Sequence, residues 1–426
     1  MLSFLLVIGV LLIILFLGLP VAFSLGSTSV ILILLNHLPV KIIGSTMYSS
    51  LESFTLLAIP LFVLMSQILL DGRVGDDLFD VMNAWVRHLP GGLAIATILA
   101  CAFFAAITGS GAATAATIGM VAYPAMIQRG YDKKFTLGLL AAGGTLGILI
   151  PPSIPLILYG AITEESVGKL FIAGVVPGLI LTAIFVVYAV FKSKRGGFTP
   201  IERTSWSERL RVTGKNIWGI LLPILIIGGI YSGAFTPTEA AAVGLAYSLF
   251  ITVFIYKTIK IRELPKICLK SVGTSSMIAL IIAAAILFGR VMTMLMIPQK
   301  LTELIIEHNF TPLMFILAMN LLMLILGMVL ETVSIILLTM PLVAPILLAL
   351  NIDPIWYAII LTINMTMALI TPPVGMNLYV INGLSDDINM GDIIQGVWPF
   401  IILMMFMLVL AIVFPQLSLW LPSIMH

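Results

Sequence analysis

The sequence is poor in charge. Only 9% of its 426 residues are Asp, Glu, Lys or Arg, while 61% are hydrophobic and the mean hydropathy is +1.19. A typical soluble domain carries about 25% charged residues, so a soluble globular protein is excluded. Apolar runs of about 20 residues, the length of a membrane-spanning helix, recur along the whole chain. We therefore predict an all-α polytopic membrane protein with about ten crossings.

Cysteine and histidine are also scarce, and the spacings typical of disulfide frameworks or metal sites are missing. Cys101 and Cys268 are far apart and have no CxxC or histidine neighbours, which argues against a disulfide framework or a transition-metal site. No ATP-binding motif is present, so pumping by the chain's own hydrolysis is excluded. The apolar segments pair no nucleophile with a base, which argues against an intramembrane hydrolase. We predict neither an enzyme nor an organic cofactor.

The basic residues predict the orientation in the membrane. Of the 21 Lys and Arg residues, all but Lys41, Lys169, Lys300 and Arg290 lie in four loops, which the positive-inside rule makes cytoplasmic. These loops are residues 71–91, 129–134, 192–215 and 257–270. The resulting topology puts both termini on the outer side of the membrane. It also requires that residues 92–127 and 313–350 each enter and leave on one side, as re-entrant hairpins.

Shifting the chain against itself reveals an internal repeat. At an offset of 221, matched pairs occur in order, and further matches follow at offsets of 217 and 222. The pairs at 221 are Pro124 with Pro345, Asp132 with Asp353, Thr145 with Thr366, and Pro151–Pro152 with Pro372–Pro373. The topology puts Asp132 inside and Asp353 outside, so the two copies are inverted, each with about five spans and one hairpin.

The repeat and the polar stretches predict the organisation of an elevator-type transporter, with a fixed scaffold and a mobile part. The first repeat (1–191) has scaffold helices 1–35, an arm 36–53 and transport elements 54–191 with a hairpin 92–127 and a broken helix 135–160. A basic connector (192–215) follows. The second repeat (216–426) has scaffold helices 216–256, an arm 257–273 and transport elements 274–426 with a hairpin 313–350 and a broken helix 356–381.

The proline pairs predict where transport takes place. Proline removes a backbone donor and breaks a spanning helix, and irregular backbone at membrane depth is tolerated where it lines a cavity or is buried. In inverted-repeat transporters such breaks meet near the midplane, where freed carbonyls bind cations. We predict cation ligands in the first half at Thr108, Ser110, Gly111, Thr114, Gly143, Thr145 and Pro151.

The second half offers a matching set of candidate cation ligands, which includes one carboxylate. A glutamate inside the membrane is expensive and marks a functional site, although Glu331 could instead cap a helix or sit in a wet vestibule. Hard oxygen ligands suit sodium, and a proton could use the same glutamate. The predicted ligands here are Glu331, Thr332, Ser334, Thr366, Thr371 and Gly375. For substrate binding we predict Ser153, Asn364 and Asn377.

Several stretches together resemble the large membrane subunit of a TRAP (tripartite ATP-independent periplasmic) transporter. They span nearly the whole chain in a specific order. They are "LLAIPLFVLMSQIL" (56–69), "ITGSGAATAATIG" (107–119), "LGILIPPSIPLILYG" (146–160), "GAFTPTEAAAVG" (233–244), "GMVLETVSIILLTMPLVAPI" (327–346) and "ITPPVGMNLYV" (370–380). The chain departs from the family pattern at Thr114 and Glu331, where aspartate is common.

The resemblance implies sodium-driven uptake of a small organic acid, such as sialic acid or a C4-dicarboxylate, by an elevator mechanism. It also implies a place in the bacterial cytoplasmic (inner) membrane, so that both termini are predicted to be periplasmic. It further implies two partners, a periplasmic substrate-binding protein and a small four-helix membrane subunit. A binding-protein-independent symporter coupled to sodium or protons is the alternative within transport. An ion channel would need a continuous polar or carbonyl-lined filter, which two inverted hairpins with different polar sets do not suggest.

Overall fold

The computed structural model describes residues 7–425 except 8, 12, 16 and 197–201, and this part contains helices and no strand. Met1 and His426, and with them the chain ends predicted to be periplasmic, lie outside the described residues. The elements of the first half are α2 (Val21–Leu35), α3 (Ile42–Leu51), η1 (Thr55–Leu57), α4 (Ala58–Asp71), α5 (Val74–Val86), α6 (Gly92–Thr108), α7 (Gly111–Gln128), α8 (Lys133–Leu149), α9 (Ile154–Thr163) and α10 (Val167–Arg195).

The second half begins after a connector helix, α11 (Trp206–Lys215). Its elements are α12 (Ile217–Tyr231), α13 (Pro237–Phe250), η2 (Ile251–Ile255), η3 (Ile261–Glu263), α14 (Leu264–Met294), α15 (Ile297–Glu307), α16 (Pro312–Gly327), α17 (Thr332–Ala349), α18 (Pro354–Ala368), α19 (Met376–Asn382), α20 (Met390–Val413) and α21 (Gln416–Ser423).

Helix length and composition confirm the predicted class, an all-α polytopic membrane protein. Among the described residues, six helical segments are long and apolar enough to cross a membrane, and two bent pairs would raise the number to eight. The count is below the ten expected because several apolar stretches form shorter helices. These are Val21–Leu35, Gly92–Thr108, Pro312–Gly327 and Pro354–Ala368.

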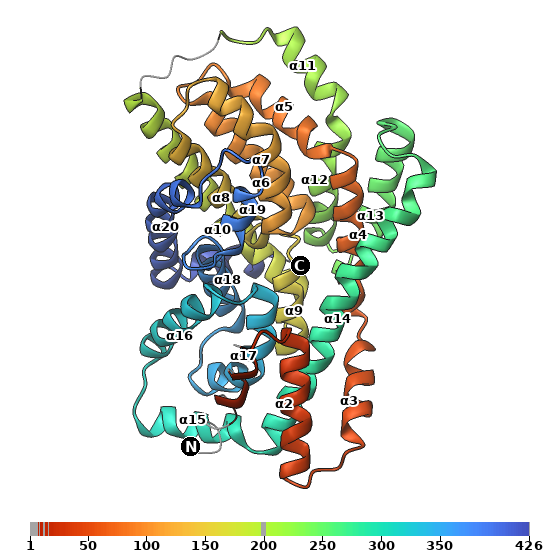
Figure 1. Ribbon diagram of the computed structural model, residues 1–426, viewed down its shortest axis with the longest axis vertical. Coiled ribbons are helices and arrows are strands. Elements are labelled where there is room, and N and C mark those ends of the chain that lie inside the picture. The colour runs from red at the N-terminus through yellow and green to blue at the C-terminus, as the bar shows by residue number, and fades with distance from the viewer. Residues whose placement is uncertain (1–6, 8, 12, 16, 197–201, 426) are drawn as a thin grey trace.

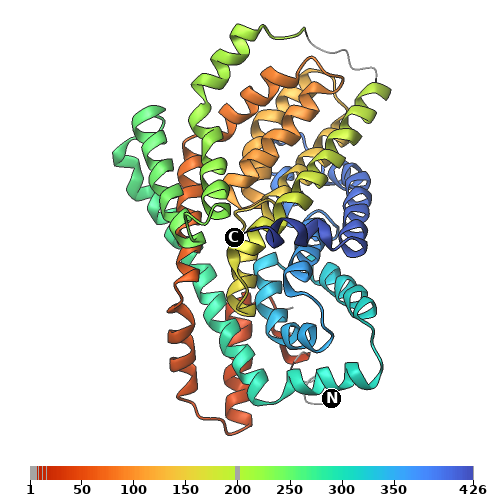
Figure 2. The same cartoon turned by 180° about the vertical axis from the view of Figure 1, so that it is seen from behind.

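The helices are arranged along one long axis (Figure 1). The cytoplasmic loops predicted from basic residues include α5 and α11, which lie near one end, while α3 and α15, predicted to be outside, lie at the other. The long helix α14 packs against α2, α3, α4 and α17. Seen from behind (Figure 2), the C-terminal α21 lies against α10.

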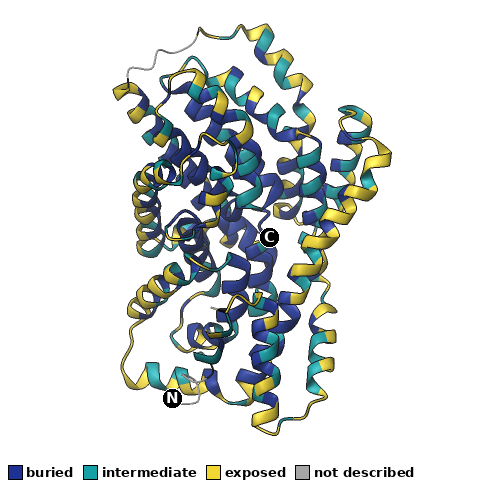
Figure 3. Ribbon diagram, in the orientation of Figure 1, coloured by how far each residue is buried: buried dark blue, intermediate teal, exposed yellow. Residues whose placement is uncertain are grey.

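Burial separates an inner group of helices from an outer one (Figure 3). Helices α6, α8 and α18 are buried along most of their length, whereas α13, α14, α16 and α20 keep exposed apolar faces. Leu269 is 72% exposed, Leu321 62% and Ile402 66%. In a bilayer such side chains meet lipid tails, which are as apolar as leucine.

The two predicted arms have different shapes. In the first half α3 and the η1–α4 segment meet at a bend of 62°. In the second half the predicted boundary at residue 273 falls inside the continuous helix α14.

Several helix starts follow ordinary capping rules: Asp132 accepts from Phe135 N at 2.8 Å and Asp353 from Trp356 N at 2.9 Å. These two aspartates are partners at the offset of 221.

Candidate functional site

Both proline pairs interrupt helices, the first at a buried position and the second at a partly exposed one. Residues 150–153 separate α8 from α9, and residues 369–375 separate α18 from α19. The peptide bond within each pair, Pro151–Pro152 and Pro372–Pro373, is cis. Because each helix is interrupted, the ends at the break have carbonyl and amide groups that lack partners within the helix.

The first hairpin turns at Gly109 and Ser110, between α6 and α7. Gly109 has φ +60°, a conformation that favours glycine, and a Cβ there would lie 2.4 Å from the carbonyl oxygen of Pro152. A Cβ on Gly147 would lie 2.5 Å from the carbonyl oxygen of Ser110. Only glycine lets the backbone of the tip lie directly against α8 and the first break.

Hydroxyl groups form a short chain at this tip. Thr108 Oγ1 and Thr114 Oγ1 are 3.2 Å apart, and Thr114 Oγ1 donates to Ser110 O at 2.8 Å. Thr145 Oγ1 donates to Ala142 O at 2.7 Å. The buried threonine hydroxyls are satisfied, and their oxygens keep lone pairs that can accept a donor or bind a cation.

Three of the predicted first-site residues contact other elements. A Cβ on Gly143 would lie 2.9 Å from the sulfur of Cys101, so Gly143 faces α6. Pro151 packs near Gly174 of α10, where an added Cβ would lie 3.6 Å from Pro151 Cδ. A Cβ on Gly111 would lie 3.4 Å from the carbonyl oxygen of Gly144, so Gly111 faces α8 beside the break.

The second hairpin turns over residues 328–331, between α16 and α17. Glu331 occupies the position before α17 without capping it, and its side chain is half-buried. No hydrogen bond or ion pair of the Glu331 side chain is found in the part of the chain that the structure describes, and its backbone carbonyl accepts from Ile335 N at 3.1 Å. Met328 O accepts from Gly375 N at 3.3 Å, which joins this tip to the second break.

The other second-half candidates lie around the same break. Thr366 Oγ1 donates to Ile363 O at 2.6 Å, and Thr371 Oγ1 donates to Met367 O at 2.7 Å. Thr332 and Ser334, in the first turn of α17, are 5% and 2% exposed. Hydroxyl oxygens and one carboxylate therefore gather where α17 begins and α18 ends.

The two halves exchange their short helices. Helix α9, which follows the first break, packs against α17 of the second hairpin, and α19, which follows the second break, packs against α7 and α8. Asn377 on α19 donates from Nδ2 to Ala141 O at 3.1 Å. With the amide in this orientation its buried Oδ1 has no hydrogen-bond partner, and it lies 3.7 Å from a Cβ built on Gly111.

The three predicted substrate ligands have different partners. Ser153 Oγ donates to Ile148 O at 2.6 Å and closes its own break, while Asn377 joins the first tip. Asn364 donates to Asn320 O and Oδ1, both at 2.8 Å, and its own Oδ1 is buried without a partner. Asn320 was not predicted from the sequence. Its signal was an asparagine alone in the apolar stretch of α16.

A second link between the halves lies on the side predicted to be cytoplasmic. Asp387, in the loop before α20, accepts from Tyr123 Oη of α7 at 2.5 Å and lies 3.2 Å from Lys133 Nζ. Lys133 also donates to the backbone carbonyl of Asp387. The hydrogen bonds from Ser385 and Tyr123, together with Lys133, lower the pKa of Asp387 from its usual 3.8 to about 2.

Comparison with known proteins gives the family. Residues 8–417 match the family model for the tripartite ATP-independent periplasmic transporter, DctM component. The chain is 44% identical over 403 residues to a C4-dicarboxylate TRAP transporter large permease protein of Pseudomonas aeruginosa, covering 94% of each chain. It is 34% identical over 411 residues to a sialic acid TRAP transporter large permease protein of Vibrio cholerae, covering 96% of each.

A solved structure supports the fold. The crystal structure of the YdaH transporter of Alcanivorax borkumensis is similar with a TM-score of 0.64, covers 90% of this chain and 88% of its own, and is 11% identical. At that identity the likeness concerns the fold alone. The family model and the relatives agree over nearly the full length, and the chain belongs to the DctM component family of tripartite ATP-independent periplasmic transporters, as a membrane transport subunit and not an enzyme.

Proposed function

We propose that this chain imports a small organic acid by sodium-coupled secondary transport, as the large membrane subunit of a tripartite system. The organic acid is delivered by a periplasmic substrate-binding protein, and a small membrane subunit packs beside this chain in the bacterial inner membrane. The family description names a tripartite system, of which this chain is one component. One relative is named for a C4-dicarboxylate and another for sialic acid, so the proposed substrate class is a small carboxylate.

The observation that carries the proposal is the exchange of α9 and α19 between the halves. It joins both helix breaks and both hairpins in one body. In that body the Oδ1 atoms of Asn364, on α18, and Asn377, on α19, are buried without partners. A buried polar atom without a partner costs about 1–3 kcal/mol, so these oxygens suit a bound ion or substrate. Such oxygen-rich breaks at membrane depth are typical of transport sites.

Sodium is the proposed coupling ion because the candidate ligands are hard oxygen atoms. The first site would use Thr108, Ser110 and Thr114 with the carbonyls around the first break. The second would use Glu331, Ser334 and the break from Thr366 to Gly375. No group of three or more His, Cys, Asp or Glu residues suited to a metal ion occurs within the described residues, and sodium does not require one.

Elevator movement is the proposed mechanism. Helices α2, α12 and α13 would belong to the fixed scaffold, and the hairpins with the broken helices to the moving part. The elevator movement is tested by the accessibility of a cysteine introduced as Ser153→Cys, in a variant whose exposed Cys268 is replaced by Ser. An impermeant thiol reagent should label Ser153→Cys from opposite sides of the membrane in two transport states. Labelling from one side in every state would contradict the movement.

The function is tested by uptake into proteoliposomes. The chain would be reconstituted with its small subunit and supplied with the binding protein, radiolabelled C4-dicarboxylates and sialic acid, and an inward sodium gradient. We expect uptake of one acid that requires both sodium and the binding protein. Equal uptake without the binding protein would favour the independent symporter. Uptake driven by a pH gradient alone would make Glu331 a proton site.

A further inference from the structure

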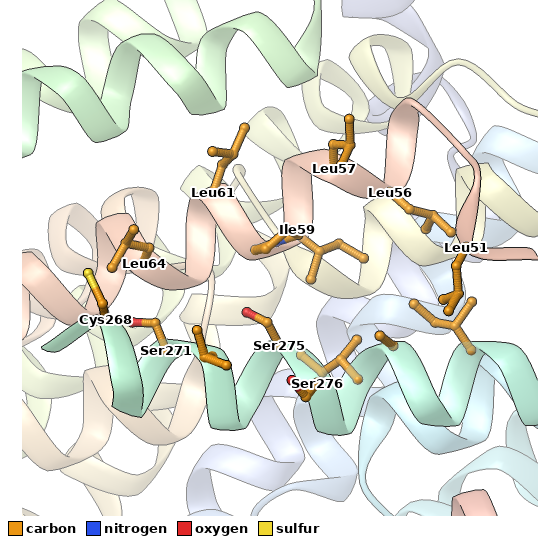
Figure 4. A pocket seen from close by; sticks show the side chains of 15 residues that line it. Leu51, Leu56, Leu57, Ile59, Leu61, Leu64, Cys268, Ser271, Ser275 and Ser276 are labelled. Carbon is orange, nitrogen blue, oxygen red and sulfur yellow. The ribbon is translucent and has the colours of Figure 1, made fainter. Parts of the chain in front are cut away.

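A groove runs between α4 and α14 on the lipid-facing side. The helices are antiparallel neighbours, because Asp71 at the end of α4 pairs with Lys270 near the start of α14. The cavity between them measures about 590 Å³. Figure 4 shows Ile59 and Leu64 from α4 and Cys268, Ser271 and Ser275 from α14 beside this space. Its walls are almost entirely apolar.

A second cavity of about 500 Å³ continues the groove at its cytoplasmic end, and its lining is charged. Arg73, Lys266 and Lys270 lie here with Asp71 and Glu263. Lys270 Nζ is 3.1 Å from Asp71 Oδ2, and a Glu263 carboxylate oxygen accepts from the backbone N–H of Lys260 at 2.8 Å. Within the described chain, Arg73 and Lys266 have no carboxylate within 4.0 Å.

The dimensions fit a lipid chain better than a helix. From Cys268 to Ile282 the groove follows α14 for roughly 21 Å at 1.5 Å per residue. One leaflet contributes about 15 Å of the roughly 30 Å hydrocarbon core. A transmembrane helix of about 10 Å diameter would need roughly 1,600 Å³ over that length, more than the total empty space of about 1,250 Å³ in the groove. A helix could therefore cover the groove but not fill it.

We propose that the groove holds one acyl chain of an anionic phospholipid from the cytoplasmic leaflet, with its phosphate between Arg73 and Lys266. Basic pockets between helices on the cytoplasmic side attract anionic headgroups, and that leaflet carries negative lipid charge. The acyl chain would continue past Cys268 and Ser271 toward Ile282. The lipid would bridge α4, which packs on α13, and α14, which includes the second predicted arm.

The test uses native mass spectrometry to measure which lipids stay bound to the protein. The full chain with its small subunit is released from nanodiscs that contain equal amounts of phosphatidylglycerol and phosphatidylethanolamine. Wild-type protein should retain phosphatidylglycerol selectively. Arg73→Gln and Lys266→Gln should each lower that retention about fivefold, whereas Lys194→Gln, exposed on the same side, should not. Val272→Trp fills the groove and should lower retention, whereas Leu269→Trp, exposed on the same helix and outside the groove lining, should not.

Equal retention of the two lipids, or retention unchanged in Arg73→Gln, Lys266→Gln and Val272→Trp, would overturn the proposal. The second readout does not depend on how the variants fold. A photo-cross-linker on Cys268, which is exposed while Cys101 is buried, should label phosphatidylglycerol. Labelling of the small subunit instead would identify the groove as a protein interface.

Discussion

The first helix break is closed and the second is open. Residues 150–153 are buried or nearly so, and Gly109 fits against Pro152 without space for a side chain. At the second break Pro373 is exposed, and Glu331 on the facing hairpin is half-buried. The second tip spans residues 328–331, whereas the first turns at Gly109 and Ser110 alone.

The two hairpin tips also differ in the chemistry of the groups that they offer to a ligand. The first tip offers hydroxyl and carbonyl oxygens and one amide from Asn377, all neutral. The second tip contains Glu331. A neutral oxygen site binds a cation by many weak dipoles, while a carboxylate adds a full charge in a medium of low dielectric. Two sites with one backbone plan can therefore differ in ion affinity and in their sensitivity to protons.

The largest expected effect comes from removing that charge. Glu331→Gln keeps the size of the side chain and should weaken apparent sodium affinity about tenfold or more, equal to ~1.4 kcal/mol. Glu303→Gln, on the exposed face of α15, is the matched control. Sodium titration of uptake makes the measurement. If both variants titrate like wild type, the second tip has no charged ion site and the comparison fails.

The closed packing of the first tip can be broken by a single methyl group. Gly147→Ala would bring Cβ within 2.5 Å of Ser110 O and should destabilise the protein by about 1–3 kcal/mol. Gly228→Ala on α12 meets nothing within 4 Å and serves as control. Thermal unfolding in detergent measures both. Equal melting temperatures would mean that the first tip has room to move away from α8.

Asn377 tests whether the first tip also serves the substrate. Asn377→Ala removes the unpartnered oxygen and one hydrogen bond to Ala141 O. The KM for the organic acid should rise about tenfold, the value of one hydrogen bond to a polar ligand, with sodium half-saturation unchanged. Asn382→Ala on the same helix is the control. A change in sodium half-saturation alone would reassign Asn377 to the ion.

The smallest effect is expected at the contact that Asp387 makes between the two halves. Because the pKa of Asp387 is lowered to about 2 in the folded protein, its stabilising contribution is complete above its usual pKa of 3.8 and is lost as pH falls toward 2. Asp387→Asn should therefore lower the melting temperature slightly at pH 7, by an amount that stays constant down to pH 5. Asp386→Asn is the neighbouring control. A difference that changes between pH 7 and pH 5 would contradict this assignment.

Much of the fold could be predicted because membrane sequences are simple. Hydrophobicity indicates the helices, proline indicates their breaks, and glycine at 109, 147 and 375 marks close backbone approach or a left-handed turn. The helix in residues 74–86, within a predicted cytoplasmic loop, was not foreseen. Its charged residues make the segment look like a loop, although Asp76 and Asp77 begin an amphipathic helix.

The partners of the site residues could not be predicted. That Asn377 would meet Ala141 depends on α19 packing against the other half, and a single sequence does not contain that contact as a local pattern. The pairing of Asn364 with Asn320 is of the same kind. A small residue such as Gly143 suits a cation site and a helix contact equally well. The structure places Gly143 against Cys101.

The exchange of α9 and α19 has a consequence for biosynthesis. Helix α19, with Asn377, packs against α7 and α8 beside the first tip, so the surroundings of that tip are incomplete until α19 has left the ribosome and entered the membrane. Similarly, α17 gains its partner α9 from a segment inserted far earlier. Neither half can be finished as an independent unit during translation. A truncated chain would expose polar backbone to lipid and become a substrate for membrane proteases.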